Sequence, residues 1–165
     1  MAKQQEFPFI PKSTASIEPG HFWSIPLRHG GYACGRVIQL WLKDGKRDSQ
    51  MFLAGLMDWS GDAAPTADAI AGCGVIEQGS VHIKTIRENR GEILGLLDLA
   101  LDGIEPNLFK NAGHATFVQR GFEELRPFDP RLDAALPVFS TWGFRAIKML
   151  AEVRCGKPRR DKKFT

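Results

Sequence analysis

The sequence predicts a β-rich α+β domain, in which an antiparallel meander forms a partly closed, barrel-like sheet and a helix follows near the C-terminus. Three observations support this fold class. Apolar and polar residues alternate from Phe22 to Leu27, a long strand-like run spans 32–42 behind a glycine turn, and helical spacing of apolar residues is clearest after Thr141. A chain of 165 residues can build one such domain around a single core.

The expected meander consists of three strands joined by two glycine-containing turns. Strands and turns alternate along the chain in the order 22–27, 28–31, 32–42, 44–45 and 50–59. In the first strand, Trp23, Ile25 and Leu27 share one face, and Pro26 places the end of this strand at a sheet edge because proline has no backbone N–H to donate. Gly35 has no side chain to pack, so we expect a bulge there or a close approach by another element.

The rest of the chain is expected to contain a second hairpin, one short strand and one clear helix. The other elements are an extended arm over 1–19, a short helix or tight connection over 62–72, a hairpin of strands 81–86 and 92–97, a long loop over 98–113, a short strand over 115–119 and an irregular crossing over 126–137. The helix is expected from Trp142 to about Arg154, with Thr141 as its N-cap. Its apolar face comprises Phe144, Ile147, Leu150 and Ala151.

Charge is distributed unevenly over three expected parts, an arm (1–19), a single β-rich domain (20–155) and a basic tail (156–165). Residues 154–165 contain six basic side chains and one acidic one, whereas residues 1–153 contain 16 basic and 18 acidic side chains, a net charge of −2. Clustered lysine and arginine bind phosphates by releasing counterions, so we expect any contact with nucleic acid to involve the tail alone.

The chain begins without the apolar stretch of a signal peptide, and it contains no apolar run of the roughly 18 residues that a membrane helix needs. We therefore expect a cytoplasmic protein with no membrane contact. The cysteines, Cys34, Cys73 and Cys155, are odd in number and widely spaced, which indicates free thiols rather than disulfides or a zinc site.

Motifs of the common catalytic and cofactor-binding classes are missing. Gly72 and Gly74 begin like a dinucleotide-binding fingerprint, but Glu77 stands where the third glycine belongs. The four histidines are not at the spacing through which one helix presents two metal ligands. We therefore expect no catalytic residue, no cofactor and no metal site, and we expect the protein to act by binding.

Two groups of residues are candidates for binding a partner. Asp58, Trp59 and Asp62 surround a glycine turn at the end of the third expected strand, where an Asx-type turn is the structural alternative. Glu123 and Glu124 form an acidic pair, for which a solvated charged surface is the alternative. Loops around these residues, and the loop over 98–113, are where we expect partner contacts.

Three segments occur in a characteristic order along the chain: EPGHFWSIPL at 18–27, GYACGRV at 31–37 and LPVFSTWG at 136–143. Together they resemble the immunity protein 26 family over most of 18–155. The resemblance implies a mostly β fold and a cytoplasmic protein that neutralises a cognate bacterial polymorphic toxin domain by binding it. It implies no catalytic residues. The residues that would define the fold are Gly20, Pro26, Gly35, Arg36, Trp142 and Gly143.

Two other classes of function remain as alternatives. The segment from Gly20 to Ile25 also resembles the first strand of SH3-like toxin endoribonucleases, which would imply a small nucleic-acid-binding or ribonuclease-like barrel. A metal-dependent enzyme assembled from dispersed histidine and aspartate side chains is the second alternative.

Overall fold

A computed structural model describes residues 6–156 and contains two β-sheets and four α-helices within that range. The main sheet has the strand order β5-β1-β2-β3-β4-β9 and does not close into a barrel. Its strands are β1 (His21–Pro26), β2 (Tyr32–Lys43), β3 (Lys46–Gly61), β4 (Val75–His82), β5 (Ile93–Leu96) and β9 (Thr141–Trp142). The helices are α1 (Ala67–Ile70), α2 (Lys84–Glu88), α3 (Pro130–Asp133) and α4 (Ala146–Cys155). The predicted β-rich α+β class with a C-terminal helix is confirmed.

The predicted meander is present as β1, β2 and β3, which pair antiparallel in sequence order. The third strand is longer than expected and begins at Lys46 rather than at Gln50. The reason lies in the turn, since Asp44 and Gly45 have φ values of +50° and +75°. Two successive residues with positive φ make a tight hairpin whose twist matches that of the strands, so pairing resumes immediately.

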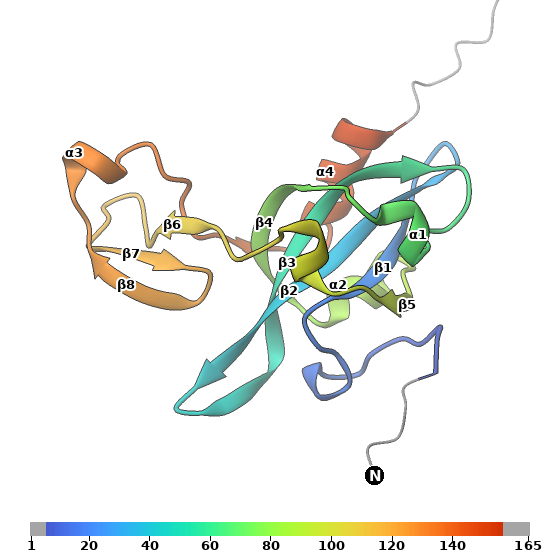
Figure 1. The fold of residues 1–165 in the computed structure, drawn as a ribbon, viewed down its shortest axis with the longest axis horizontal. Coiled ribbons are helices and arrows are strands. Elements are labelled where there is room, and N and C mark those ends of the chain that lie inside the picture. The colour runs from blue at the N-terminus through green and yellow to red at the C-terminus, as the bar shows by residue number, and fades with distance from the viewer. Residues whose placement is uncertain (1–5, 157–165) are drawn as a thin grey trace, which may run out of the picture.

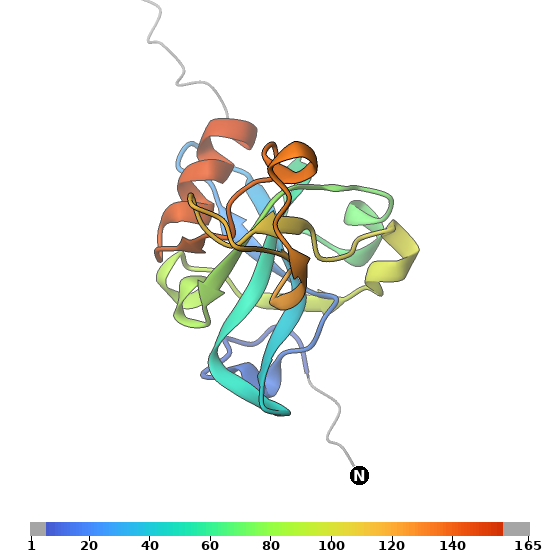
Figure 2. The same cartoon turned by 90° about the vertical axis from the view of Figure 1, so that its left-hand side faces the viewer.

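The main sheet is covered on both faces because alternate residues of its strands point to opposite sides. Figure 2 shows α4 on one side of the sheet and α1 on the other. The core on the α4 side includes Trp23, Ile25, Val37, Phe52, Ile147 and Ala151. The smaller core on the α1 side is formed by Phe22, Cys34, Met57 and Ile70. Apolar residues of both parities in β1 and β2 are therefore buried.

The predicted hairpin of 81–86 with 92–97 is wrong. β4 pairs with β3 through Val81 and Phe52, and β5 pairs with β1 on the opposite side of the sheet. Residues 84–88 form helix α2 in between. Ile83 and Ile86 are both buried. Their spacing of three residues fits one turn of a helix, although the run 81–86 also alternates between apolar and polar residues as a strand does.

The C-terminal helix begins four residues later than predicted. Thr141 is not its N-cap, because Thr141 and Trp142 form strand β9 and pair parallel to β4. Helix α4 starts at Ala146 after a turn in which the Ala146 N–H donates to the Gly143 carbonyl. Ile147 is buried in the core as predicted.

Residues 98–137, predicted as loops around one short strand, contain much more structure. They form the 3₁₀-helix η2 (Leu99–Asp102), strands β6 (Leu108–Lys110), β7 (Phe117–Arg120) and β8 (Glu123–Pro127), and helix α3. The three strands make a separate sheet in the order β6-β7-β8. Figure 1 shows this sheet and α3 projecting from one side of the main sheet. We call residues 105–139 the lobe.

The N-terminal segment, predicted as an extended arm, contacts the main sheet. Phe9 forms a β-bridge with Ile93, and a short 3₁₀-helix, η1 (Thr14–Ser16), leads to the buried Ile17. The basic tail lies almost wholly outside the described residues, which end at Gly156. None of the helices within 6–156 is long and apolar enough to cross a membrane.

Candidate partner-binding surface

The lobe is attached to the main sheet by aromatic stacking on the β2–β3 hairpin. The ring of Phe122 lies 5.2 Å from that of Trp41, with an angle of 5° between their planes. The Phe122 N–H donates to Oε1 of Gln39 at 2.9 Å. Phe139 meets Phe122 edge-on at 5.4 Å. Stacked aromatic pairs stabilise by about 0.5–1.5 kcal/mol beyond the area they bury, so this contact gives the lobe a defined position.

A second attachment lies at the start of the lobe. The side chain of Gln78 in β4 donates to the Glu105 carbonyl and accepts from the Asn107 N–H, both at 2.9 Å. Gln78 is buried, and this pair of bonds satisfies both ends of its amide group. The lobe is therefore held at its first residues as well as at Phe122.

The outer strand of the lobe, β8, is exposed along its whole length. It carries the acidic pair Glu123 and Glu124, followed by Leu125, which is 47% exposed. Residues of β7 and β8 line an open hollow of about 600 Å³ that includes Glu124, Leu125 and Phe117. Carboxylates thus stand beside apolar side chains on one projecting surface.

An arginine–aspartate pair fixes the far end of this surface. The guanidinium of Arg126 in β8 donates two parallel bonds to the carboxylate of Asp133, at 2.6 and 2.7 Å. The backbone N–H of Asp129 donates to the same carboxylate at 2.9 Å. The bond from Arg126, followed by that from Asp129, lowers the pKa of Asp133 to about 2. Because Arg126 is engaged in this way, its charge offsets Asp133 rather than the neighbouring glutamates.

Glu123 and Glu124 have no such partner, since neither belongs to an ion pair within residues 6–156. Both side chains are exposed. The acidic charge of β8 is therefore available to a partner.

The carboxyl group of Asp133 is expected to titrate at about pH 2 in the folded protein, well below its ordinary value of 3.8. A lowered pKa means that the pair stabilises the lobe fully above pH 3.8 and that this stabilisation is lost as the pH falls through about 2. The measurement is a carbon-13 NMR titration of the Asp133 carboxyl. In Arg126→Gln the titration should move up towards 3.8; a wild-type titration already at that value would contradict the pair.

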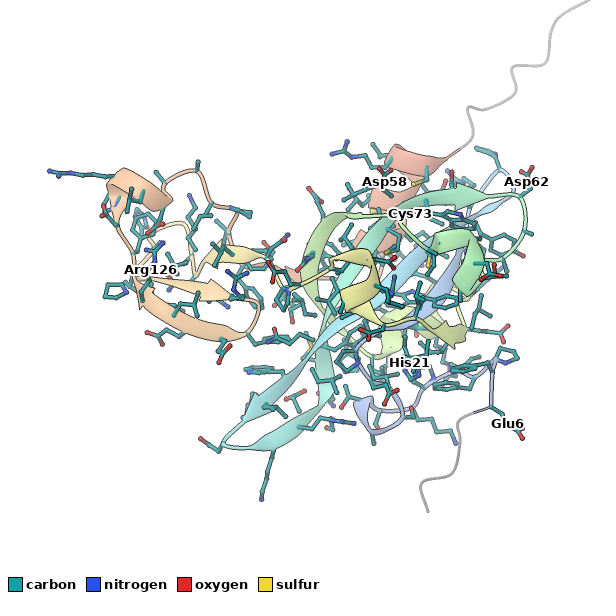
Figure 3. All side chains as sticks on the ribbon, in the orientation of Figure 1. Glu6, His21, Asp58, Asp62, Cys73 and Arg126 are labelled. Carbon is teal, nitrogen blue, oxygen red and sulfur yellow. The ribbon has the colours of Figure 1, made fainter. Side chains whose placement is uncertain are left out.

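The other candidate group does not join this surface. Asp58 and Trp59 lie near the end of β3, and Asp62 directly follows it. Figure 3 shows Asp62 at the opposite end of the molecule from Arg126, and Asp58 over the main sheet, away from the lobe. Trp59 is half-buried against the smaller core and lies over Gly61. The backbone N–H of Asp58 donates to the Gly74 carbonyl at 2.8 Å. The structure thus presents two separate candidate surfaces, and the one on β3 has its aromatic residue turned partly into the core.

Neither the protein-family models nor the curated proteins nor the solved structures give a match to this chain. The resemblance to the immunity protein 26 family consequently rests on the three segments quoted above and stays a prediction.

Two of the proposed fold-defining residues have plain steric roles. Gly20 has a φ of +102°, donates to the Val37 carbonyl and accepts from the Leu97 N–H. A Cβ on Gly35 would lie 2.2 Å from the ring of Trp23, so the close approach predicted at this glycine is made by the cross-strand tryptophan.

Arg36 is fully buried and connects β2 to the segment before the lobe. Its guanidinium donates to the carbonyls of Gly20 and Leu97 and to the carboxylate of Asp102 in η2. The Asp102 carboxylate also accepts from the Gly72 N–H at 2.7 Å. One buried arginine thus joins four segments of the chain.

The remaining fold-defining residues differ in how far the structure explains them. Trp142 covers Gly79, where an added Cβ would lie 2.3 Å from its ring. The Pro26 carbonyl accepts from Lys148 in α4. Gly143 has open space around its Cβ position, so nothing steric requires glycine there.

Residues 6–156 contain no group of three His, Cys, Asp or Glu side chains that could hold a metal ion. Burial raises the pKa of the Cys34 thiol, which lies in the smaller core.

Sequence reasoning identified the acidic pair but missed the strand that carries it and the aromatic residue that positions the strand. Gly121, with a φ of +56°, turns the chain between β7 and β8. A sequence signal for this turn and its aromatic residue was present, since Gly121 and Phe122 follow shortly after the strand predicted at 115–119.

Proposed function

We propose that this chain is an immunity protein that neutralises a cognate bacterial toxin domain by binding it through the lobe. The observation that carries this proposal is strand β8, in which every residue is exposed. Its exposed leucine follows two glutamates that belong to no ion pair in the described part of the chain. The three segments that resemble the immunity protein 26 family supply the class of partner.

Binding of this kind needs a preorganised surface and no chemistry. A stable interface covers about 800 Å² on each partner, which is more than β8 alone can offer, so the neighbouring hollow and α3 would be covered with it. The carboxylates of Glu123 and Glu124 favour a partner with a basic surface, because complementary charge raises the association rate and excludes wrong partners. A toxin that acts on nucleic acid has such a surface.

The experiment uses the full chain and the toxin domain that this proposed function predicts in the adjacent gene. Titration calorimetry should give a dissociation constant at or below the micromolar range, and co-expression should protect cells from the toxin domain. Glu124→Arg should weaken binding by about tenfold or more, since it places a like charge against the basic partner.

Asp58→Arg is the matched comparison, because it makes the same change of charge on the other candidate surface. It should leave the dissociation constant within about twofold of the wild type, as expected for a charge outside the interface. If Asp58→Arg abolishes binding while Glu124→Arg does not, the lobe is the wrong surface. If the wild-type chain neither binds nor protects, the immunity function itself is wrong.

A further inference from the structure

A second hollow, of about 610 Å³, lies on the α4 side of the molecule, and its lining residues all lie outside the lobe. Its walls are the end of β1 with the turn that follows (26–28), the end of α2 (88–90) and α4 with its N-cap (145–152). We call it the α4 hollow. Its lining includes none of the partner-binding candidates predicted from the sequence, although Pro26, predicted as a fold-defining residue, belongs to it.

Positive charge dominates the rim of the α4 hollow. Arg28, Arg90 and Arg145 line it and are exposed, with Glu88 as the one exposed carboxylate among the lining residues. Within residues 6–156, none of these three arginines belongs to an ion pair. Three cations facing one carboxylate make a surface that attracts negative charge.

The inner wall of the hollow is fixed by a polar network. Lys148 and Glu152, one turn apart on α4, form an ion pair at 3.2 Å. The Glu152 carboxylate also accepts from the Arg28 N–H at 2.6 Å, and Lys148 donates to the Pro26 carbonyl. Because these two charges satisfy each other, they leave the charge of the rim unchanged while they hold α4 against the end of β1.

A buried amide fixes the opposite wall. Asn89 at the C-cap of α2 is 5% exposed, and its Nδ2 donates to the Thr85 carbonyl at 3.0 Å and to the Phe144 carbonyl at 2.7 Å. The second bond joins the end of α2 to the residue directly before Arg145. The backbones that carry Arg90 and Arg145 are therefore held in place relative to each other before any ligand arrives.

Arg90 has a backbone conformation that favours glycine. It follows the C-cap of α2 with a φ of +59°, and its N–H donates to the Arg87 carbonyl. Glycine or asparagine is the usual residue at this position because a larger side chain is strained there. A strained, charged residue that lines a hollow is an outlier of the kind found at functional sites.

Exposed apolar side chains continue the surface along α4. Met149 lines the hollow and is 66% exposed, and Val153, one turn further on, is 82% exposed. Arg145, Met149 and Val153 follow one another at a spacing of four, so they share one face of the helix. Methionine and arginine are both enriched in protein interfaces relative to the rest of the surface.

We propose that the α4 hollow binds an acidic segment of a partner protein, with carboxylates against Arg28, Arg90 and Arg145 and an apolar side chain against Met149. A protein segment fits the lining better than a nucleic acid does, because the described residues that line the hollow include no aromatic side chain on which a base could stack. The exposed Glu88 and Met149 would also face a phosphate backbone without a favourable contact. This inference does not rest on the toxin-binding function of the lobe.

The test measures fluorescence anisotropy of a labelled peptide of alternating glutamate and leucine with the full chain at low salt. The same peptide with glutamine in place of glutamate and a labelled oligothymidylate are the comparison probes. The glutamate peptide should bind most tightly, and Arg145→Gln and Arg90→Gly should each weaken it about threefold to fivefold, as expected for one exposed charge pair.

Arg90→Gly separates binding from folding. Because glycine relieves the left-handed backbone, this variant should melt about 2–4 °C higher than the wild type while it binds the peptide less tightly. Arg87→Gln is the matched control, since Arg87 lies on α2, is exposed and does not line the hollow. It should leave peptide binding unchanged. The basic residues beyond 156 are common to all variants and cannot cause a difference between them.

Three results would overturn the proposal. One is equal affinity for the glutamate and glutamine peptides, which would remove the role of charge. Another is a loss of binding in Arg87→Gln as large as that in Arg145→Gln, which would show attraction to net charge rather than to the hollow. The third is tighter binding of oligothymidylate that weakens in Arg145→Gln, which would assign the hollow to nucleic acid.

Discussion

Replacing Arg36 by methionine is expected to lower the free energy of unfolding by about 3–5 kcal/mol. The Arg36 side chain is fully buried, and its Nη1 lies 3.2 Å from Oδ2 of Asp102, whose side chain is 2% exposed. Methionine fills a similar volume but leaves the Asp102 charge without a counterion. It also removes the donor to the Leu97 carbonyl, and an unsatisfied buried acceptor costs about 1–3 kcal/mol, whereas the Gly20 carbonyl keeps the Leu97 N–H as a donor.

The measurement is urea denaturation of Arg36→Met beside Arg87→Met, which changes an exposed arginine and should cost less than about 0.5 kcal/mol. The double variant Arg36→Met with Asp102→Leu should lose less than the sum of the two single variants, because no buried charge remains unpaired. A difference of less than about 1 kcal/mol between Arg36→Met and Arg87→Met would show that the buried network has no such role.

Gly35→Ala is expected to destabilise the fold by about 3 kcal/mol or more. The added Cβ would lie 2.2 Å from the ring of Trp23, which is fully buried and packs edge-on against Phe52 at 5.8 Å. Trp23 has no space to withdraw into, so either β1 or β2 must shift. Loss of the thermal transition, or a large fall in its midpoint by tryptophan fluorescence, is the readout.

Alanine substitutions at two other glycines serve as comparisons for Gly35→Ala. Gly79→Ala meets Trp142 at 2.3 Å, but Trp142 is only half-buried in a two-residue edge strand and can swing aside, so we expect a smaller loss of about 1 kcal/mol. Gly113→Ala has open space and should change stability by less than about 0.5 kcal/mol. If Gly35→Ala fails to fold, combining it with Trp23→Leu should restore part of the stability; equal effects at Gly35 and Gly113 would refute the steric account.

The meander could be predicted because its information is local. Alternation in β1, the Asp44-Gly45 turn and the apolar run of β2 each specify one element without reference to the rest of the chain. Gly35 predicted a close approach by another element for the same reason, since a glycine inside a strand leaves the space of a side chain empty. What the sequence left open at Gly35 was the identity of the neighbour, which only the register of β1 against β2 supplies.

The lobe could not be predicted because its strands are short and its positioning contacts are distant in sequence. β6 has three residues, too few for any periodicity to be recognised. Phe122 reaches Gln39 and Trp41 across about 80 residues of chain. Proline at 127, 130 and 137 suggested an irregular crossing, whereas Pro127 ends an exposed edge strand and Pro130 begins α3.

The candidate residues were found one group at a time, and their spatial relation came only from the fold. Glu123 and Glu124 were recognisable in the sequence as an acidic pair. The sequence did not reveal that Arg126, two residues further on, is bound by Asp133. The rim of the α4 hollow joins Arg28, Arg90 and Arg145, which no motif connects. Charge that is scattered in sequence becomes a surface only after β1, α2 and α4 have packed.

The most direct test of the account is hydrogen–deuterium exchange of the full chain with and without the toxin domain that the proposed immunity function predicts in the adjacent gene. If the lobe is the contact surface, binding should slow amide exchange in β7 and β8 (117–127) and leave residues 58–62 unchanged. Slowed exchange at 58–62 with none in 117–127 would contradict the account.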